Sequence, residues 1–109
     1  MVYIMTEKRK PSYDLEAFKK AFRTVERLRI TEVAFLDAVA LGFDKPEIIK
    51  IIQTMQRAHF YKSMTSYRDY RVWQDVYHVP SKAGLLYVKF TAHVLTEFLL
   101  LSFKEKDNE

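Results

Sequence analysis

The 109-residue sequence contains no cysteine, which excludes disulfides, thiol catalysis and cysteine-ligated zinc. With only two glycines and three prolines, it does not resemble a linker-rich or disordered chain. No apolar run approaches the roughly 20 residues that a membrane-spanning helix needs, and none near the start is long enough for a signal peptide. We therefore expect a cytoplasmic protein without membrane association.

The length fits one domain, over residues 1–109, with one modest hydrophobic core. Met5 offers an alternative start, so we expect residues 1–5 to lie upstream of the true start or outside the ordered domain, and residues 107–109 to form a tail. The sequence shows no internal repeat and no low-complexity segment.

Positive charge and aromatic residues are concentrated in residues 56–90. The chain has a formal net charge of +4, and this window, with 6 Lys and Arg against 2 Asp and Glu, accounts for all of it. It also holds half of the aromatic residues. Cations give salt-dependent phosphate affinity, and aromatic rings give stacking surfaces for unpaired bases. On composition alone, nucleic-acid binding and an ordinary basic surface are about equally favoured.

The first half of the chain has helical spacing. Ser12 or Asp14 can cap a helix that runs to about Val25, with an apolar stripe formed by Leu15, Phe18, Phe22 and Val25. Polar and apolar residues alternate over 27–30, which indicates a short strand before the second helix.

Two further helices have clear start signals. Thr31 can cap a helix over residues 32–41, closed by Gly42. Asp44 and Glu47 have the spacing of a capping box, with Pro46 tolerated in the first turn. The residues of this third helix that we expect to face inward are Ile48, Ile51, Ile52 and Met55.

The second half changes to strand-like segments rich in aromatic and β-branched residues, over residues 60–65, 72–78, 85–91 and 98–104. Sequential strands separated by short turns indicate an antiparallel meander. Helices followed by strands predict an α+β fold, with the N-terminal helices packed on one face of the antiparallel sheet.

Strict alternation along these strands sorts the side chains onto two faces, provided that no bulge intervenes. The face toward the helices would carry Trp73, Tyr77, Leu86, Val88, Phe90, Leu99, Leu101 and Phe103. The open face would carry Lys62, Met64, Gln74, His78, Tyr87, Lys89, Ser102 and Lys104. The open face is therefore expected to be polar and basic.

Four ordered sequence blocks resemble the MqsR family of bacterial mRNA-cutting toxins. They are FYKSMT at residues 60–65, WQDVY at 73–77, GLLYVK at 84–89 and SFKEK at 102–106. The triplet Glu7-Lys8-Arg9 near the start is similar as well. The resemblance is close over about residues 58–106 and looser upstream.

This resemblance implies a RelE-like fold and a type II toxin that cleaves mRNA, with family members favouring GC-containing sites. It also implies a cognate MqsA-like antitoxin that binds the toxin and represses their shared operon. Direct DNA binding is expected only through that antitoxin, and no cofactor is implied.

Matching by motif position, the resemblance implies that the catalytic residues are Lys62, Gln74, Tyr87 and Lys104. The residues expected to contact RNA are Tyr61, Met64, Arg68, Arg71, His78 and Lys89. His78 departs from the resemblance, because a member of this family has Arg after the WQDVY block. A protonated His78 could still donate to a phosphate. The loop at residues 81–84 also departs from the pattern.

RNA cleavage without a metal ion needs a base for the 2′-hydroxyl, donors for the charged phosphate and an acid for the leaving 5′-oxygen. Lys62 and Lys104 could clamp the phosphate, Tyr87 could serve as base or acid, and Gln74 could act as a neutral donor. The sequence lacks cysteine, a histidine pair at ligand spacing and a carboxylate cluster on the predicted open face, so we expect no metal site.

Several of these residues also have ordinary structural interpretations. Trp73 and Tyr77 are more typical of a core than of a stacking platform. Asp75, on the helix side, is expected to hydrogen-bond backbone or pair with a basic residue rather than act as an acid. His59 and His93 are expected at the surface. A non-catalytic RNA-binding module and a protein-interaction partner with a basic face remain alternative functions.

Overall fold

Helices precede most of the strands along the chain, as the sequence predicts. The computed structural model describes residues 6–92 and 97–106, and the expectations for residues 1–5, 107–109 and His93 lie outside this part. Its elements are β1 (Glu7–Lys8), α1 (Leu15–Ala21), α2 (Glu32–Ala40), α3 (Lys45–Thr54), β2 (Phe60–Thr65), β3 (Trp73–Ser81), β4 (Gly84–Ala92) and β5 (Phe98–Glu105). No helix of the described residues has the length and hydropathy to cross a membrane.

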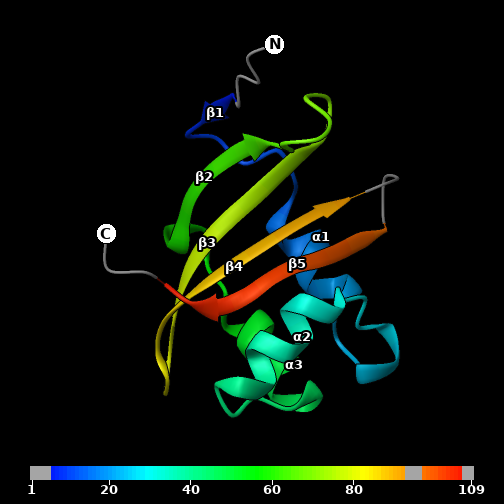
Figure 1. Cartoon of the computed structure of the whole chain (residues 1–109), viewed down its shortest axis with the longest axis vertical. Coiled ribbons are helices and arrows are strands. Elements are labelled where there is room, and N and C mark those ends of the chain that lie inside the picture. The colour runs from blue at the N-terminus through cyan, green and yellow to red at the C-terminus, as the bar shows by residue number, and fades with distance from the viewer. Residues whose placement is uncertain (1–5, 93–96, 107–109) are drawn as a thin grey trace.

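The strands form one antiparallel sheet in the order β1-β2-β3-β4-β5 (Figure 1). This confirms the α+β class and the meander. The predicted strand bounds are correct for β2 and differ by one to three residues for the others. The edge strand β1 was not predicted, because a segment of two residues has no detectable periodicity.

Asp14, rather than Ser12, caps α1, since its carboxylate accepts a hydrogen bond from Glu16 N at 2.9 Å. The predicted extension of this helix to Val25 is wrong, because α1 ends at Ala21 and Val25 is 37% exposed in a separate 3-10 turn. Gln53 of α3 donates to the carbonyls of Lys19 and Phe22 at 2.8 and 3.0 Å. These tertiary hydrogen bonds satisfy backbone carbonyl groups at the end of α1. Local residue spacing could not reveal them.

The start signals of α2 and α3 are confirmed. Thr31 accepts from Ala34 N at 3.2 Å, Gly42 has a positive φ of 91°, and Asp44 with Glu47 forms the capping box. The inward residues of α3 differ at one position. Ile51 is half-buried and packs against the core as predicted, but Ile49, which was not predicted to face inward, is buried as well.

The segment at residues 27–30 does not form the predicted strand between two helices. Only Ile30 is in a β-bridge, parallel to Leu100 of β5. Leu100 N donates to Arg29 O at 2.9 Å, and Thr31 N donates to Leu100 O at 3.1 Å. The segment therefore pairs along the outer edge of β5, satisfying backbone groups of an edge strand.

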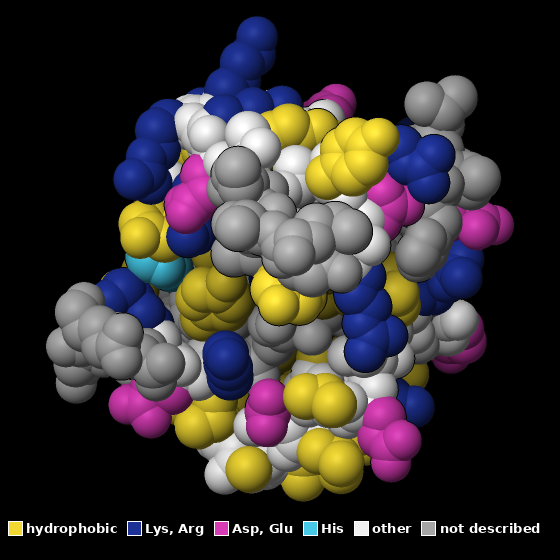
Figure 2. Space-filling view, turned by 45° about the horizontal axis from the view of Figure 1, so that its top comes forward, with side chains coloured by type: hydrophobic (Ala, Val, Ile, Leu, Met, Phe, Trp, Pro, Cys, Tyr) yellow, Lys and Arg dark blue, Asp and Glu magenta, His cyan; other side chains and the backbone are white. Residues whose placement is uncertain are grey.

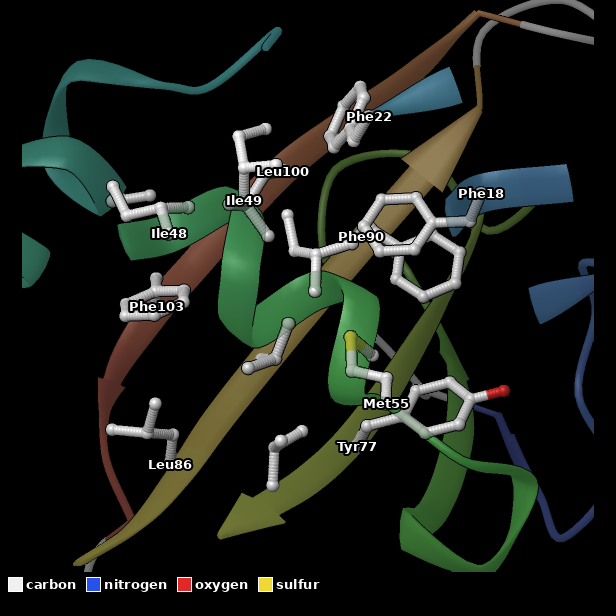
Figure 3. Packing of buried hydrophobic residues seen from close by; sticks show 14 of the residues in the cluster. Phe18, Phe22, Ile48, Ile49, Met55, Tyr77, Leu86, Phe90, Leu100 and Phe103 are labelled. Carbon is white, nitrogen blue, oxygen red and sulfur yellow. The ribbon is translucent and has the colours of Figure 1, made fainter. Parts of the chain in front are cut away.

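The core lies where the helices meet β3, β4 and β5 (Figure 3). Phe18 of α1 stacks on Phe90 of β4 with ring centroids 3.8 Å apart and planes 4° from parallel. α2 runs beside β5 (Figure 1). The largest fully buried side chains are Tyr77, Phe18, Phe22, Phe90, Phe103, Ile48, Ile52, Met55, Leu86, Leu100, Val76 and Val79.

A β-bulge in β5 changes the predicted sorting of side chains. In β5 the register shifts between Lys89 and Phe90, so that Lys89 pairs with Ser102 but Phe90 pairs with Leu100. Leu101 is the extra residue, and alternation is reversed beyond it. Phe98 and Leu100 are therefore buried in the core, and the predicted core positions of Leu99 and Leu101 are wrong.

Trp73 and Tyr77, both predicted to face the core, have different environments. Tyr77 is fully buried in the core, which confirms its prediction. Trp73 is half-buried at the end of β3, outside the core cluster, and Lys8 Nζ lies 4.1 Å from its ring centroid. The core prediction is therefore wrong for Trp73, because the helices do not reach this end of the strand.

A buried carboxylate attaches the N-terminal segment to the sheet. Asp75 is fully buried and accepts hydrogen bonds from Ser12 N at 3.0 and 3.1 Å and from Tyr13 N at 2.9 Å. This confirms the prediction that Asp75 hydrogen-bonds backbone. Backbone donors satisfy a charge that would otherwise be costly to bury.

Two tyrosines at the core differ in whether their hydroxyl groups are satisfied. Tyr13 Oη donates to Trp73 O at 2.9 Å. Tyr77 Oη is buried without a hydrogen-bond partner among the described residues. Burial, followed by the nearby Asp75 charge, raises the pKa of Tyr77 to about 12, so the phenol stays neutral near physiological pH.

This difference predicts opposite effects of removing each hydroxyl. Tyr77→Phe should leave the free energy of unfolding unchanged or raise it, because an unsatisfied buried hydroxyl is removed. Tyr13→Phe should lower it by about 1 kcal/mol, because a made hydrogen bond is lost. Urea unfolding followed by circular dichroism measures both. A Tyr77→Phe variant less stable than Tyr13→Phe would contradict this assignment.

Candidate active site

Antiparallel register brings aromatic and basic residues from four strands into one row. His78 of β3 pairs with Tyr87 of β4, which pairs with Lys104 of β5. The row continues to Tyr61 of β2, where the register shifts between Phe60 and Lys62. This bulge places Tyr61 against His78, with ring centroids 4.3 Å apart and planes at 23°.

These residues line a hollow of about 590 Å³, which we call the basic pocket. Its lining residues are Tyr61, Lys62, His78, Tyr87, Lys104, Glu105 and Lys106. Figure 2 shows Lys and Arg side chains gathered around a histidine on this side of the molecule. The pocket contains three of the four predicted catalytic residues and two of the predicted RNA contacts.

Lys62 is held by a carboxylate from the start of the chain. Its Nζ donates to both oxygens of Glu7 at 2.9 and 3.0 Å, and its side chain is only 18% exposed. Glu7 is positioned because β1 pairs with β2, with Glu7 opposite Met64. The sequence placed Glu7 in a similar motif but did not predict this contact across 55 positions.

Arg9 also reaches this end of the sheet. Its guanidinium donates to Tyr61 O at 3.1 Å and lies 5.3 Å from the centroid of the Tyr61 ring. On the opposite side of the row, Lys104 Nζ lies 5.4 Å from the centroid of Tyr87. Cations therefore flank the aromatic row at both ends, an arrangement that favours an anionic, base-bearing ligand.

Burial and neighbouring charge set the protonation states in the basic pocket. Burial, followed by the positive charges of Lys106 and Lys62, lowers the pKa of His78 below its usual 6.5. Burial, followed by Tyr61 and Glu7, raises the pKa of Tyr87 above its usual 10. Near neutral pH the imidazole is therefore mainly neutral and the phenol keeps its proton.

The other predicted site residues lie outside the basic pocket. Gln74 pairs with Met64 farther along the sheet. Lys89 pairs with Val76 and Ser102, and burial followed by the charges of Lys104 and Lys62 lowers its pKa.

Arg68 and Arg71 lie in the exposed β2–β3 loop. Arg71 donates from Nε to Asp69 Oδ1 at 3.1 Å, which restrains this side chain beside a carboxylate. The loop also carries Tyr67 and Tyr70, which are 66% and 76% exposed. The loop therefore offers aromatic and basic groups at a distance from the basic pocket.

Sequence reasoning missed Glu7, Arg9, Glu105 and Lys106 as neighbours of the site. The signal available for Lys106 was its place in the SFKEK block. The triplet Glu7-Lys8-Arg9 was a signal for Glu7 and Arg9, but their contacts with the site follow only from strand pairing, because β1 is too short to show a periodic pattern.

The chemistry of the basic pocket suits an anion. Lysine ammonium groups donate hydrogen bonds and repel cations, whereas a divalent metal needs clustered carboxylates, histidines or thiolates. Within residues 6–92 and 97–106, no three His, Asp or Glu side chains are grouped in a way that could hold a metal ion. The neutral imidazole and protonated phenol add one proton acceptor and one donor to the lysines.

Comparison with known proteins gives two matches. A family model described as "Motility quorum-sensing regulator, toxin of MqsA" matches residues 10–105. The chain is also 40% identical over 100 residues to the mRNA interferase toxin MqsR of Escherichia coli (strain K12). That alignment covers 92% of this chain and 99% of the relative.

The electrostatics of the pocket predict how His78 titrates. Nuclear magnetic resonance should give His78 a pKa below 6.5, because burial and, after it, the nearby ammonium groups oppose its protonation. Lys106→Gln should raise this pKa, since one opposing charge is removed. The matched control is Lys50→Gln, at an exposed position on α3, which should leave it unchanged. A His78 pKa above 6.5, or one insensitive to Lys106, would contradict these electrostatics.

Proposed function

The chain belongs to the MqsR family of mRNA interferase toxins, and we propose that it cuts RNA in the basic pocket without a metal ion. The observation that carries this proposal is the convergence of Lys62, Tyr87 and Lys104 from three strands on one hollow. Two ammonium groups and a phenol beside one another are suited to hold a phosphodiester and protonate its leaving group.

In this mechanism the substrate supplies its own nucleophile. The 2′-hydroxyl loses its proton to a base as its oxygen attacks the adjacent phosphorus, and the bond to the 5′-oxygen breaks as that oxygen takes up a proton. Lys62 and Lys104 bind the non-bridging oxygens and stabilise the additional negative charge of the transition state. The products are a 2′,3′-cyclic phosphate and a 5′-hydroxyl.

Tyr87 is the general acid. Because its pKa is raised, the phenol remains protonated near neutral pH and can donate to the departing 5′-oxygen. The ammonium of Lys104 lies 5.4 Å from the ring centroid and stabilises the phenolate left behind. The residues alone permit either a base or an acid role for Tyr87, and the raised pKa of its phenol favours the acid role.

The contact between Glu7 and Lys62 orients the ammonium before RNA binds. A carboxylate 2.9 Å from Nζ restricts the flexible lysine side chain and places its charge at the edge of the basic pocket. An incoming phosphate either binds the Lys62 ammonium together with this carboxylate or takes its place. Glu7 is therefore a positioning residue rather than a catalytic one.

RNA beyond the cleaved bond follows the open face of the sheet. Gln74, which the resemblance implies to be catalytic, lies outside the basic pocket, so we assign it a hydrogen bond to the neighbouring nucleotide. Met64 adds an apolar contact beside it, and Lys89 adds a positive charge near the RNA backbone. Tyr61 gives a stacking surface. Arg68 and Arg71 contact phosphates of the flanking strand from the β2–β3 loop.

The protein is the toxin of a toxin–antitoxin system. We propose that it is a single RelE-like domain, with helices over one sheet face and RNA on the other, and that it acts in the cytoplasm. The proposed antitoxin is of the MqsA kind and neutralises the toxin by preventing RNA from reaching the open face. Through that antitoxin the toxin takes part in repression of the shared operon.

Cleavage chemistry gives the first functional test. Purified protein should cut plain RNA in the presence of EDTA and leave 2′,3′-cyclic phosphate and 5′-hydroxyl ends. Lys62→Ala and Lys104→Ala should each slow cleavage on the order of 10²–10³-fold, because each removes a donor to the charged phosphate. Tyr87→Phe should slow cleavage while leaving RNA affinity nearly unchanged.

Matched controls separate these effects from general changes of charge or aromatic content. Lys50→Ala on α3 and Tyr70→Phe in the β2–β3 loop should retain the wild-type rate. RNA with a 2′-deoxy nucleotide at the cleaved position should bind but resist cutting. Binding without any cleavage would favour the non-catalytic RNA-binding module, and 5′-phosphate products would place the chemistry elsewhere.

Salt dependence tests the basic face independently of catalysis. Affinity for 2′-deoxy-substituted RNA should fall with salt, with a log–log slope of about −0.7 per phosphate contacted. Lys104→Ala should make this slope shallower by roughly 0.7, because one phosphate contact is lost. Fluorescence anisotropy at several salt concentrations measures the slope. Affinity that does not change with salt would rule out the basic face as the binding surface.

A further inference from the structure

His78 lies in the middle of the basic pocket, surrounded by groups from every neighbouring strand. The residues that line the pocket with it are Tyr61 and Lys62 from β2, Tyr87 from β4, Lys104 and Glu105 from β5 and Lys106 just beyond β5. Glu7 of β1 is linked to this group through Lys62. Any phosphate bound by Lys62 and Lys104 therefore lies beside the imidazole.

The ring of His78 is held in a defined orientation. Stacking on Tyr61 at 4.3 Å fixes its plane, and strand pairing fixes its backbone opposite Tyr87. The centroids of the His78 and Tyr87 rings are 6.1 Å apart. The two rings are therefore direct neighbours on the floor of the basic pocket, so a phosphodiester bound over them can meet a proton acceptor and a proton donor at the same time.

We propose that His78 is the general base that removes the proton from the attacking 2′-hydroxyl, an assignment that rests on the proposed function of the basic pocket. A ring nitrogen takes this proton as the 2′-oxygen bonds to phosphorus. The bond from phosphorus to the 5′-oxygen breaks, and that oxygen takes the proton of Tyr87. His78 is left as imidazolium and Tyr87 as phenolate, and proton exchange with water restores both.

The charges around His78 favour this role over the phosphate contact expected from the sequence. A base must be unprotonated before reaction, and burial with the charges of Lys106 and Lys62 keeps the free imidazole neutral near neutral pH. A phosphate donor would instead need the imidazolium form. The imidazolium formed during the reaction is stabilised by the bound phosphate, which compensates for the neighbouring ammonium groups.

Arginine cannot accept a proton near neutral pH. His78→Arg is therefore a discriminating variant, because arginine retains a phosphate donor and removes the base. His78→Asn removes the base and cannot carry the positive charge of an imidazolium or an arginine.

The test is the pH profile of kcat/KM, measured with labelled RNA from about pH 5 to about pH 9 for the full chain. For the wild type, kcat/KM should rise with pH through the pKa of free His78 and then level off, since this constant reports the free enzyme. His78→Asn and His78→Arg should lose this rising limb, and each should fall about 10²-fold or more at neutral pH. The control His59→Asn, outside the basic pocket, should keep the wild-type profile.

Binding of 2′-deoxy-substituted RNA provides the second readout. Affinity for this RNA should change only a few-fold in His78→Asn, which shows that the variant is folded and that proton transfer is what was lost. A rising limb that persists in His78→Asn, or a wild-type rate in His78→Arg, would overturn the assignment while leaving cleavage in the pocket intact. A wild-type protein that does not cleave, or that leaves 5′-phosphate ends, would overturn the proposed function as well.

Discussion

The alternation of side chains along β3 is the constraint on which the fold and the site both depend. Asp75 and Tyr77 face the helices, whereas Gln74 and His78 face the opposite side. The Asp75 carboxylate fixes this arrangement, because it is fully buried and accepts backbone hydrogen bonds only when it faces the segment before α1. A slip of one residue would leave that charge unsatisfied and would turn His78 into the core. One strand thus anchors the N-terminal segment and presents the centre of the basic pocket.

The two β-bulges allow the same sheet to fill the core and to line the basic pocket. At Tyr61 the bulge lets consecutive residues, Tyr61 and Lys62, both line the basic pocket. At Leu101 the other bulge allows Leu100 and Phe103 to be buried while Lys104 remains at the pocket. In a strictly alternating β5, Leu100 and Lys104 would lie on the same face of the sheet, because both are at even-numbered positions. Bulges near active sites commonly re-aim side chains in this way.

The lysines of the open face influence the site through charge as well as through contact. Lys62 and Lys106 disfavour protonation of His78, and Lys62 and Lys104 disfavour protonation of Lys89. Tyr87 keeps its proton because burial disfavours the phenolate. Groups on one small surface therefore have different protonation states near neutral pH, which general acid–base chemistry requires. Binding of an RNA phosphate would change these states, since its negative charge offsets the ammonium groups.

Local signals in the sequence determined the α+β class, the caps of α2 and α3 and the approximate positions of β2 to β5. Capping and periodicity depend on residues only a few positions apart, so one segment is enough to show them. The motif blocks indicated the family and the candidates Lys62, Gln74, Tyr87 and Lys104. Tertiary structure alone decided the end of α1 at Ala21, the burial of Leu100 in place of Leu101, and the contact of Glu7 with Lys62. It also brought His78 beside Tyr87 and separated Gln74 from the pocket. These features depend on strand register and bulges, which arise from contacts between residues distant in sequence and leave no periodic trace in any one segment.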